Sequence, residues 1–158
     1  MIREIKILTL REVSEQYDPM DHPAKLVEFW RREVVKSAWY ESEKEQLLVL
    51  SLDAKMKVKT FNLVSLGIIN QTLVHAREIF RPAIVSAASH IAIMHNHPSG
   101  DPTPSADDLK SARAMRNAGK VLGIPCVDFL IVGNPSPTNP DGFASLKMMG
   151  LVHFGECS

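Results

Sequence analysis

The stretch IAIMHNHPSGDPTPSADD, residues 91–108, decides the fold because it combines a strand pattern, a rigid turn and a helix start. Its apolar beginning, residues 91–94, is typical of a buried strand. Prolines and a glycine in residues 98–104 prevent a regular element there. From Ser105 onward the sequence favours an amphipathic helix. We therefore expect a strand and a helix joined by a proline-rich turn.

Three side chains in this stretch could bind one metal ion. His95 and His97 lie two residues apart, and a strand places side chains with that spacing on one face. Asp108, in the first turn of the predicted helix, can reach back toward them. Two histidines and one carboxylate leave a fourth tetrahedral position open for water, the pattern of a catalytic rather than a structural zinc site. The sequence thus predicts one zinc ion per chain.

The same residues also have simpler interpretations. Ser105 and Asp108 fit a capping box, in which the two side chains bind free backbone amides at a helix start. A lone histidine at a strand end is more often a hydrogen-bonded core residue than a metal ligand. The metal interpretation is favoured because the paired histidines, the rigid turn and the carboxylate all point to one place.

The rest of the chain mixes a hairpin with helical crossovers. The expected elements are a strand at residues 5–10, a helix that begins near Asp21, a hairpin of residues 47–52 with the run that carries Val58, Phe61 and Val64, a helix at 76–88, a helix from 105 to about 119, and a strand at 127–132. This order predicts the α/β class, as a single layered domain with a mixed β-sheet flanked by helices.

Composition limits the class of protein. The chain has 158 residues, is 45% apolar, and carries 18 basic and 18 acidic side chains, so it can bury a core but has no net charge to attract nucleic acid. Its cysteines, Cys126 and Cys157, form no CxxC pair, which suits a reducing compartment. We find no membrane-span or signal-peptide pattern, and we expect a cytoplasmic protein.

Four blocks of the sequence resemble the RadC-like branch of the JAB/MPN (JAMM) zinc metallopeptidases. They are HNHPSGDPTPS at 95–105, VHARE at 74–78, LGI at 122–124 with DFLIVG at 128–133, and, more weakly, FASL at 143–146 with GL at 150–151. The resemblance covers about residues 43–152. It implies a JAB/MPN (cytidine-deaminase-like) architecture, in which residues 43–158 form the RadC-like metal-binding domain and residues 1–42 are an N-terminal strand and helix within or packed on its core.

The resemblance also implies roles for individual residues. His95, His97 and Asp108 match the family's metal ligands. The family's general base is a glutamate at the start of an upstream strand, and Glu45 matches that place because it immediately precedes the apolar run. Ser105 would assist the tetrahedral intermediate through its hydroxyl. The implied activity is zinc-dependent hydrolysis of a peptide or isopeptide bond in a peptide or protein substrate.

Alternatives to these roles remain open. Glu43 or Glu78 could be the base instead of Glu45, which stands in a cluster of charged residues that could simply be solvated. Phe129 occupies a position where the family usually has histidine, so polar support at the site is missing or supplied otherwise. The alternative functions are a nucleic-acid-processing or DNA repair-associated factor, which would need a basic groove, and a metal-binding interaction module without turnover.

Overall fold

A central mixed sheet organises the part of the chain that the computed structural model describes, which is residues 11–13, 16–67 and 75–155. Five strands in this part are ordered β2-β1-β3-β4-β5. They are β1 (Gln46–Leu52), β2 (Val58–Leu66), β3 (His90–Asn96), β4 (Cys126–Val132) and β5 (Phe143–Ser145). β3 and β4 are parallel and all other neighbours are antiparallel, so the predicted mixed sheet and its β1–β2 hairpin are confirmed.

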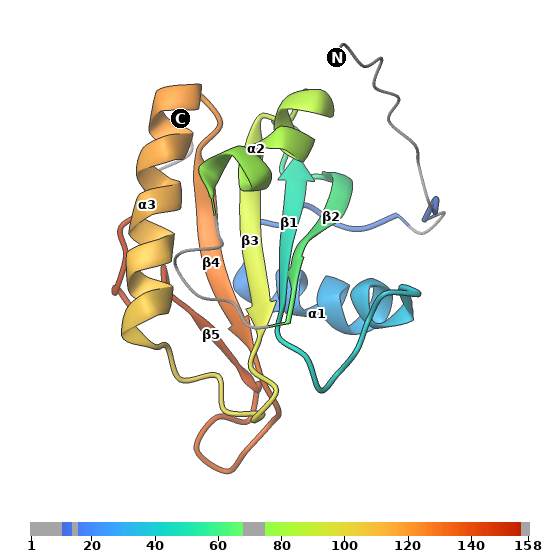
Figure 1. The fold of residues 1–158 in the computed structure, drawn as a ribbon, viewed down its shortest axis with the longest axis vertical. Helices are drawn as coiled ribbons and strands as arrows, with labels where there is room; N and C mark the ends of the chain where they lie inside the picture. The colour runs from blue at the N-terminus through green and yellow to red at the C-terminus, as the bar shows by residue number, and fades with distance from the viewer. Residues whose placement is uncertain (1–10, 14–15, 68–74, 156–158) are drawn as a thin grey trace, which may run out of the picture.

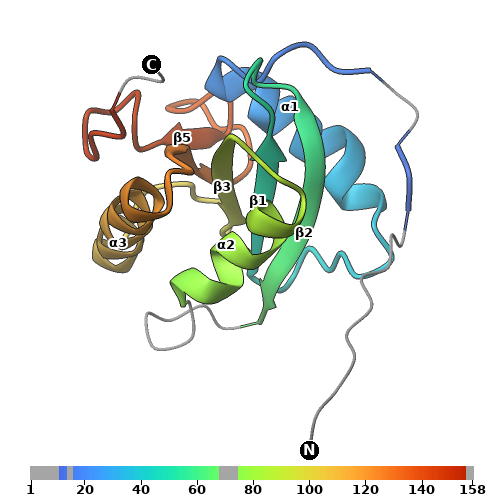
Figure 2. The ribbon, with the colours of Figure 1, turned by 90° about the horizontal axis from the view of Figure 1, so that it is seen from above.

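Helices cover both faces of this sheet. α1 (Pro23–Glu33), followed by the short 3-10 helix η1 (Val34–Lys36), lies on one face, whereas α2 (Ala76–Val85) and α3 (Ala106–Leu122) lie on the other. Figure 2 shows the three layers edge-on, with the sheet between α1 and the α2–α3 pair. The predicted single layered α/β domain is confirmed. None of the helices in the described ranges is long and apolar enough to cross a membrane.

The strands build two cores because successive side chains point to opposite faces. Residues that face α2 and α3 include Leu47, Val49, Ile91 and Ile93. Residues that face α1 include Leu48, Leu50, Ala92 and Met94. The same alternation places His95, two residues after Ile93, on the face that α2 and α3 cover. The edge of the apolar core is therefore where the candidate site begins.

Several element ends differ from the sequence-based expectation. α3 continues past Gly119 to Leu122 and ends at the left-handed cap Gly123, with φ 68°, which the sequence also allowed as the end of the helix or of an extension. A Cβ at Gly119 would lie 2.6 Å from the carbonyl oxygen of Ile124, so that close contact explains the glycine. α2 ends at Val85 rather than residue 88 and contains Pro82. β5 was not predicted because three residues are too few to show a period.

The N-terminal part was predicted as a strand and a helix. α1 forms part of the core, since Leu26, Val27, Phe29 and Trp30 are buried in the cluster on its face of the sheet. The predicted strand at residues 5–10 lies outside the described residues. The division of the chain at residue 42 stays a prediction.

Candidate metal centre

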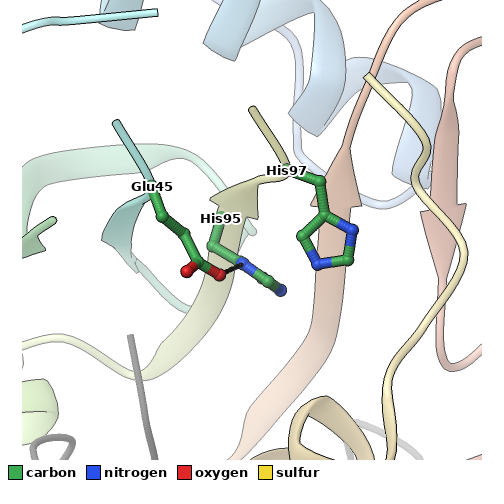
Figure 3. Close-up of side chains that lie close together, drawn as sticks. All are labelled: Glu45, His95 and His97. Carbon is green, nitrogen blue, oxygen red and sulfur yellow. Dashed lines mark ion pairs between the residues drawn. The ribbon is translucent and has the colours of Figure 1, made fainter. Parts of the chain in front are cut away.

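The strand register brings Glu45 to the paired histidines. β1 and β3 are antiparallel, with Leu47 opposite His95. Glu45 comes two residues before Leu47, so its side chain lies on the same face as the His95 ring. Its Oε1 atom is 3.2 Å from His95 Nδ1. Figure 3 shows this carboxylate and both imidazoles gathered at neighbouring strand ends.

These three residues form a candidate metal-binding group. One donor atom from each of Glu45, His95 and His97 lies within 4.8 Å of the others. The two imidazole centroids are 4.9 Å apart. His95 is buried, with 1% of its side chain exposed, whereas Glu45 and His97 are partly exposed at 24% and 19%. The group is therefore anchored in the core and open to solvent on one side.

α3 brings Asp108 to the histidines as well. Asp108 Oδ1 lies 3.0 Å from His95 Nε2, and Oδ2 lies 3.5 Å from His97 Nε2. The capping box is also present, because Ser105 Oγ accepts from the Asp108 amide at 3.1 Å and Asp108 Oδ2 accepts from the Ser105 amide at 2.7 Å. The two interpretations of Ser105 and Asp108 are thus compatible. The cap holds the carboxylate beside both imidazoles.

Ring nitrogens of both histidines are placed where they could act as ligands to a cation. His97 Nδ1 lies 2.8 Å from the carbonyl oxygen of Asp101, which can only accept, so Nδ1 carries the hydrogen. In the neutral ring, Nε2 then directs its lone pair toward Asp108. Both nitrogens of His95 are buried and make no well-formed hydrogen bond with any residue in the described ranges. The Glu45 and Asp108 carboxylates are the charged groups beside these two nitrogens, at 3.2 and 3.0 Å.

The carboxylates shift the pKa values of this cluster. Burial lowers the pKa of His95, but Asp108 and Glu45 outweigh burial and raise it. The contact with Asp108 is the main reason that the pKa of His97 is raised. Burial acts to raise the pKa of Asp108, yet the two histidines hold it well below its usual range. The site therefore favours positive charge between Asp108 and the rings, which a proton or a metal ion could supply.

The turn of residues 97–105, the metal turn, passes close to the end of β4 and is bonded to its backbone. Asn134 N–H donates to the Gly100 carbonyl at 2.7 Å, and His97 N–H donates to the Val132 carbonyl at 3.0 Å. A Cβ on Gly133 would lie 2.4 Å from the Gly100 oxygen. Glycine is required there because β4 and the metal turn pass too closely for a side chain.

Phe129 borders the site, as its place in the family pattern suggested. Its ring lies 5.5 Å from the His95 ring, centroid to centroid, at an interplanar angle of 69°. A cavity of about 10 Å³ beside them has His95 and Asp108 among its lining residues and is otherwise mostly apolar. This volume suits about one water molecule. Phe129 therefore provides apolar packing beside His95.

The other candidate glutamates are less well placed. Glu78 lies on α2 and pairs with Arg77 at 3.4 Å and Arg81 at 3.0 Å. Glu43 is exposed. In the described ranges, neither belongs to the group of donor atoms around the histidines. Of the three glutamates considered from sequence, only Glu45 is in contact with a histidine of the site.

Two contributions were missed from sequence. The Asp101 carboxylate accepts from the Thr103 amide and hydroxyl, and its carbonyl accepts from His97 Nδ1 and orients that ring. Asn96, between the two histidines, received no role, although its side chain binds the backbone beside Glu45. The only local sign of this role in the sequence was that Asn96 lies between two candidate metal ligands.

Comparisons with known proteins point to one family. A family model described as RadC-like JAB domain matches residues 20–151. A UPF0758 protein of Geobacter sulfurreducens is 41% identical over 116 residues, covering 73% of this chain and 48% of the relative. A UPF0758 protein of Clostridium perfringens is 46% identical over 108 residues, covering 68% and 45%.

A third relative, from the archaeon Methanosarcina barkeri, is 38% identical over 112 residues, covering 71% of this chain and 46% of the relative. The chain thus spans about half the length of the curated relatives that it matches. The family model covers most of the chain, including all of β1, β3, α3 and β4. The chain therefore belongs to the RadC-like JAB domain family.

Proposed function

We propose that the chain is a zinc-dependent hydrolase that cleaves a peptide or isopeptide bond. The observation that carries this proposal is the meeting of two imidazoles and two carboxylates at one strand end, where both nitrogens of His95 lack well-formed hydrogen bonds within the described residues. His95, His97 and Asp108 would hold the ion. When bound, zinc would polarise a carbonyl and activate water.

The donor atoms suit zinc in type, since zinc binds imidazole nitrogen and carboxylate oxygen. Asp108 Oδ1 lies 3.0 Å from His95 Nε2 and Asp108 Oδ2 lies 3.5 Å from His97 Nε2, so the carboxylate stands beside both rings. Magnesium and calcium prefer sites made of oxygen atoms, so two imidazoles favour zinc.

Glu45 and Ser105 would act on the reacting groups. Glu45 would act as the general base, reaching His95 from β1, whereas Asp108 reaches it from α3 as a ligand. Ser105 Oγ accepts a hydrogen bond from the Asp108 amide, which leaves the hydroxyl hydrogen for donation. That hydrogen could stabilise a developing oxyanion.

A groove beside the metal turn supports a peptide substrate. It has a volume of about 780 Å³, and residues 99–104, 134–136, Met148 and Met149 are among those that line it. Its charged lining residues are Asp101 and Asp141, which would repel phosphate groups. A chain with no net charge also lacks the basic surplus of a phosphate-backbone binder. These features favour a peptide over nucleic acid.

Metal content tests the ligand assignment. Wild-type protein, His97→Ala and Asp108→Ala would be purified without added metal and analysed by inductively coupled plasma mass spectrometry. We expect about one zinc per wild-type chain and a marked loss in both variants, because each retains only two of three ligands. Equal metal in all three proteins would contradict the assignment.

Hydrolysis tests the base. Wild type and Glu45→Gln would be assayed on quenched fluorescent peptides and on isopeptide-linked lysine substrates, with Glu43→Gln as the matched control. We expect Glu45→Gln to keep its metal and to lose about 100-fold or more in rate. Full activity in Glu45→Gln would transfer the role to another residue. Metal binding without turnover of any substrate, or salt-sensitive DNA binding instead, would favour the alternative functions.

A further inference from the structure

Asn96 lies between the two histidines and binds the backbone on both sides of Glu45. Its side chain is buried, with 6% of the residue exposed. Asn96 Oδ1 accepts a hydrogen bond from the Gln46 amide at 2.8 Å, and Nδ2 donates to the Lys44 carbonyl at 3.0 Å. One carboxamide thus holds the two peptide groups that flank the proposed base.

The partners determine which way this carboxamide points. The Gln46 amide can only donate and the Lys44 carbonyl can only accept, so a flipped carboxamide would break both bonds. The β1–β3 pairing ends with Leu47 opposite His95, and the next pair in that register is Gln46 with Asn96. The side chain therefore stands in for a peptide group and extends the ladder by one step.

Glu45 needs this support because it precedes the first residue of β1. Its carbonyl is held from the other side, where the Gly67 amide donates to it at 2.8 Å. The backbone around Glu45 is thus bonded toward β2 and, through Asn96, toward β3. Without Asn96, this strand end would lose the bonds to the Gln46 amide and the Lys44 carbonyl. Because strand ends fray readily, the backbone around Glu45 would then be held less firmly.

We propose that Asn96 is a positioning residue that places Glu45 beside the metal centre by holding the peptide groups on either side of it. Its catalytic consequence rests on the proposed hydrolase function, whereas its effect on the position of Glu45 does not. Glutamate is long and flexible, so an anchored backbone reduces the entropy lost when its carboxylate is aligned. A displacement of about 1 Å can reduce the rate about 100-fold.

Two substitutions separate the two bonds. Asn96→Leu has a similar shape and removes both, whereas Asn96→Asp keeps an acceptor for Gln46 but cannot donate to Lys44 when ionised. Asp53→Ala is the matched control. Asp53 Oδ1 accepts from the Lys55 and Lys57 amides at 2.8 and 2.9 Å, so the control removes two side-chain-to-backbone bonds at the opposite end of β1.

The first measurement needs no metal and no substrate. Amide hydrogen exchange of Gln46, followed by NMR, should accelerate about tenfold in Asn96→Leu because the amide loses its acceptor. A crystal structure of Asn96→Leu should show the Glu45 carboxylate displaced from His95. Asp53→Ala should change neither. Unchanged Gln46 exchange, with Glu45 still in contact with His95, would overturn the proposal even if the variant is less stable.

The second measurement is a double-mutant cycle on the rate of hydrolysis, with the metal content of each variant measured beside it. If Asn96 acts through Glu45, Asn96→Leu should lower the rate about 100-fold in the parent but less than about twofold in Glu45→Gln, while metal content stays unchanged. Equal effects in both backgrounds would contradict the proposal. If the parent hydrolyses none of the substrates, the proposed hydrolase function fails, while Gln46 exchange and the position of Glu45 still decide the role of Asn96.

Discussion

The two faces of the sheet differ in what their most buried residues do. On the α1 face, Phe29 and Trp30 pack against Leu48 and Leu50. On the α2–α3 face, the apolar cluster gives way to His95 and Asp108, which are buried although both are polar. Burying polar groups is costly unless they are bonded. The α1 face is therefore mainly apolar packing, whereas the other face carries a candidate metal-binding group at the edge of its core.

The largest effect should come from breaking the α1 face. Trp30→Ala removes a fully buried aromatic side chain and should lower the free energy of unfolding by about 3–5 kcal/mol, measured by urea denaturation. Metal content per folded molecule should not change, because Trp30 lies across the sheet from the histidines. Loss of metal from folded Trp30→Ala would show that the two faces are coupled.

Metal should stabilise the opposite face. Zinc at about one hundred times its dissociation constant should raise the free energy of unfolding by about 2.7 kcal/mol, because it binds the folded state only. Thermal melts with zinc and with a chelator would measure this difference. His97→Ala should lose it, whereas Trp30→Ala should keep it. An equal increase in His97→Ala would place the stabilising ion elsewhere.

The cap of α3 should link stability to the site. Ser105→Ala removes the acceptor for the Asp108 amide and should lower the free energy of unfolding by about 1 kcal/mol. Metal affinity should fall as well, because the cap holds the Asp108 carboxylate. Ser105→Thr should retain most of both, and Lys110→Ala, exposed on the same helix, should change neither. Unaltered metal affinity in Ser105→Ala would mean that Asp108 does not need the cap.

The smallest effect should be a pH dependence on the α1 side. Burial raises the pKa of Glu33, but Tyr17, Lys36 and Arg11 outweigh burial and hold it below its ordinary value of 4.5. The ionised form therefore stabilises the fold above pH 4.5, and this contribution is lost as the pH falls through the lower folded-state pKa. Glu33→Gln should lose less stability than the parent between pH 6 and pH 3 in urea denaturation. Identical pH profiles would contradict this role for Glu33.

Much of the site was predictable because its signals are local. The alternation that places His95 and His97 on one face, the prolines of the metal turn and the Ser105 cap all act within a few residues. The apolar runs likewise predicted the mixed sheet and its hairpin. Family resemblance added Glu45, a residue far from the histidines along the chain.

Contacts between distant segments were harder to predict. Asn96 received no role from the sequence, and only the β1–β3 register shows that its carboxamide binds the backbone around Glu45. Gly133 directly follows the strand predicted at residues 127–132, and no neighbouring residue indicates that the close passage of the metal turn requires a glycine there. β5 is too short to produce a periodic signal of its own.

The sequence alone determined the local elements and the kinds of donor atom, because periodicity, proline geometry and helix capping depend on neighbouring residues. Only the tertiary structure decided which carboxylates meet which ring nitrogens. That choice depends on strand register and on the angle at which α3 crosses the sheet, and both result from packing over the whole core. Glu45 and Asp108 reach His95 from opposite sides for this reason.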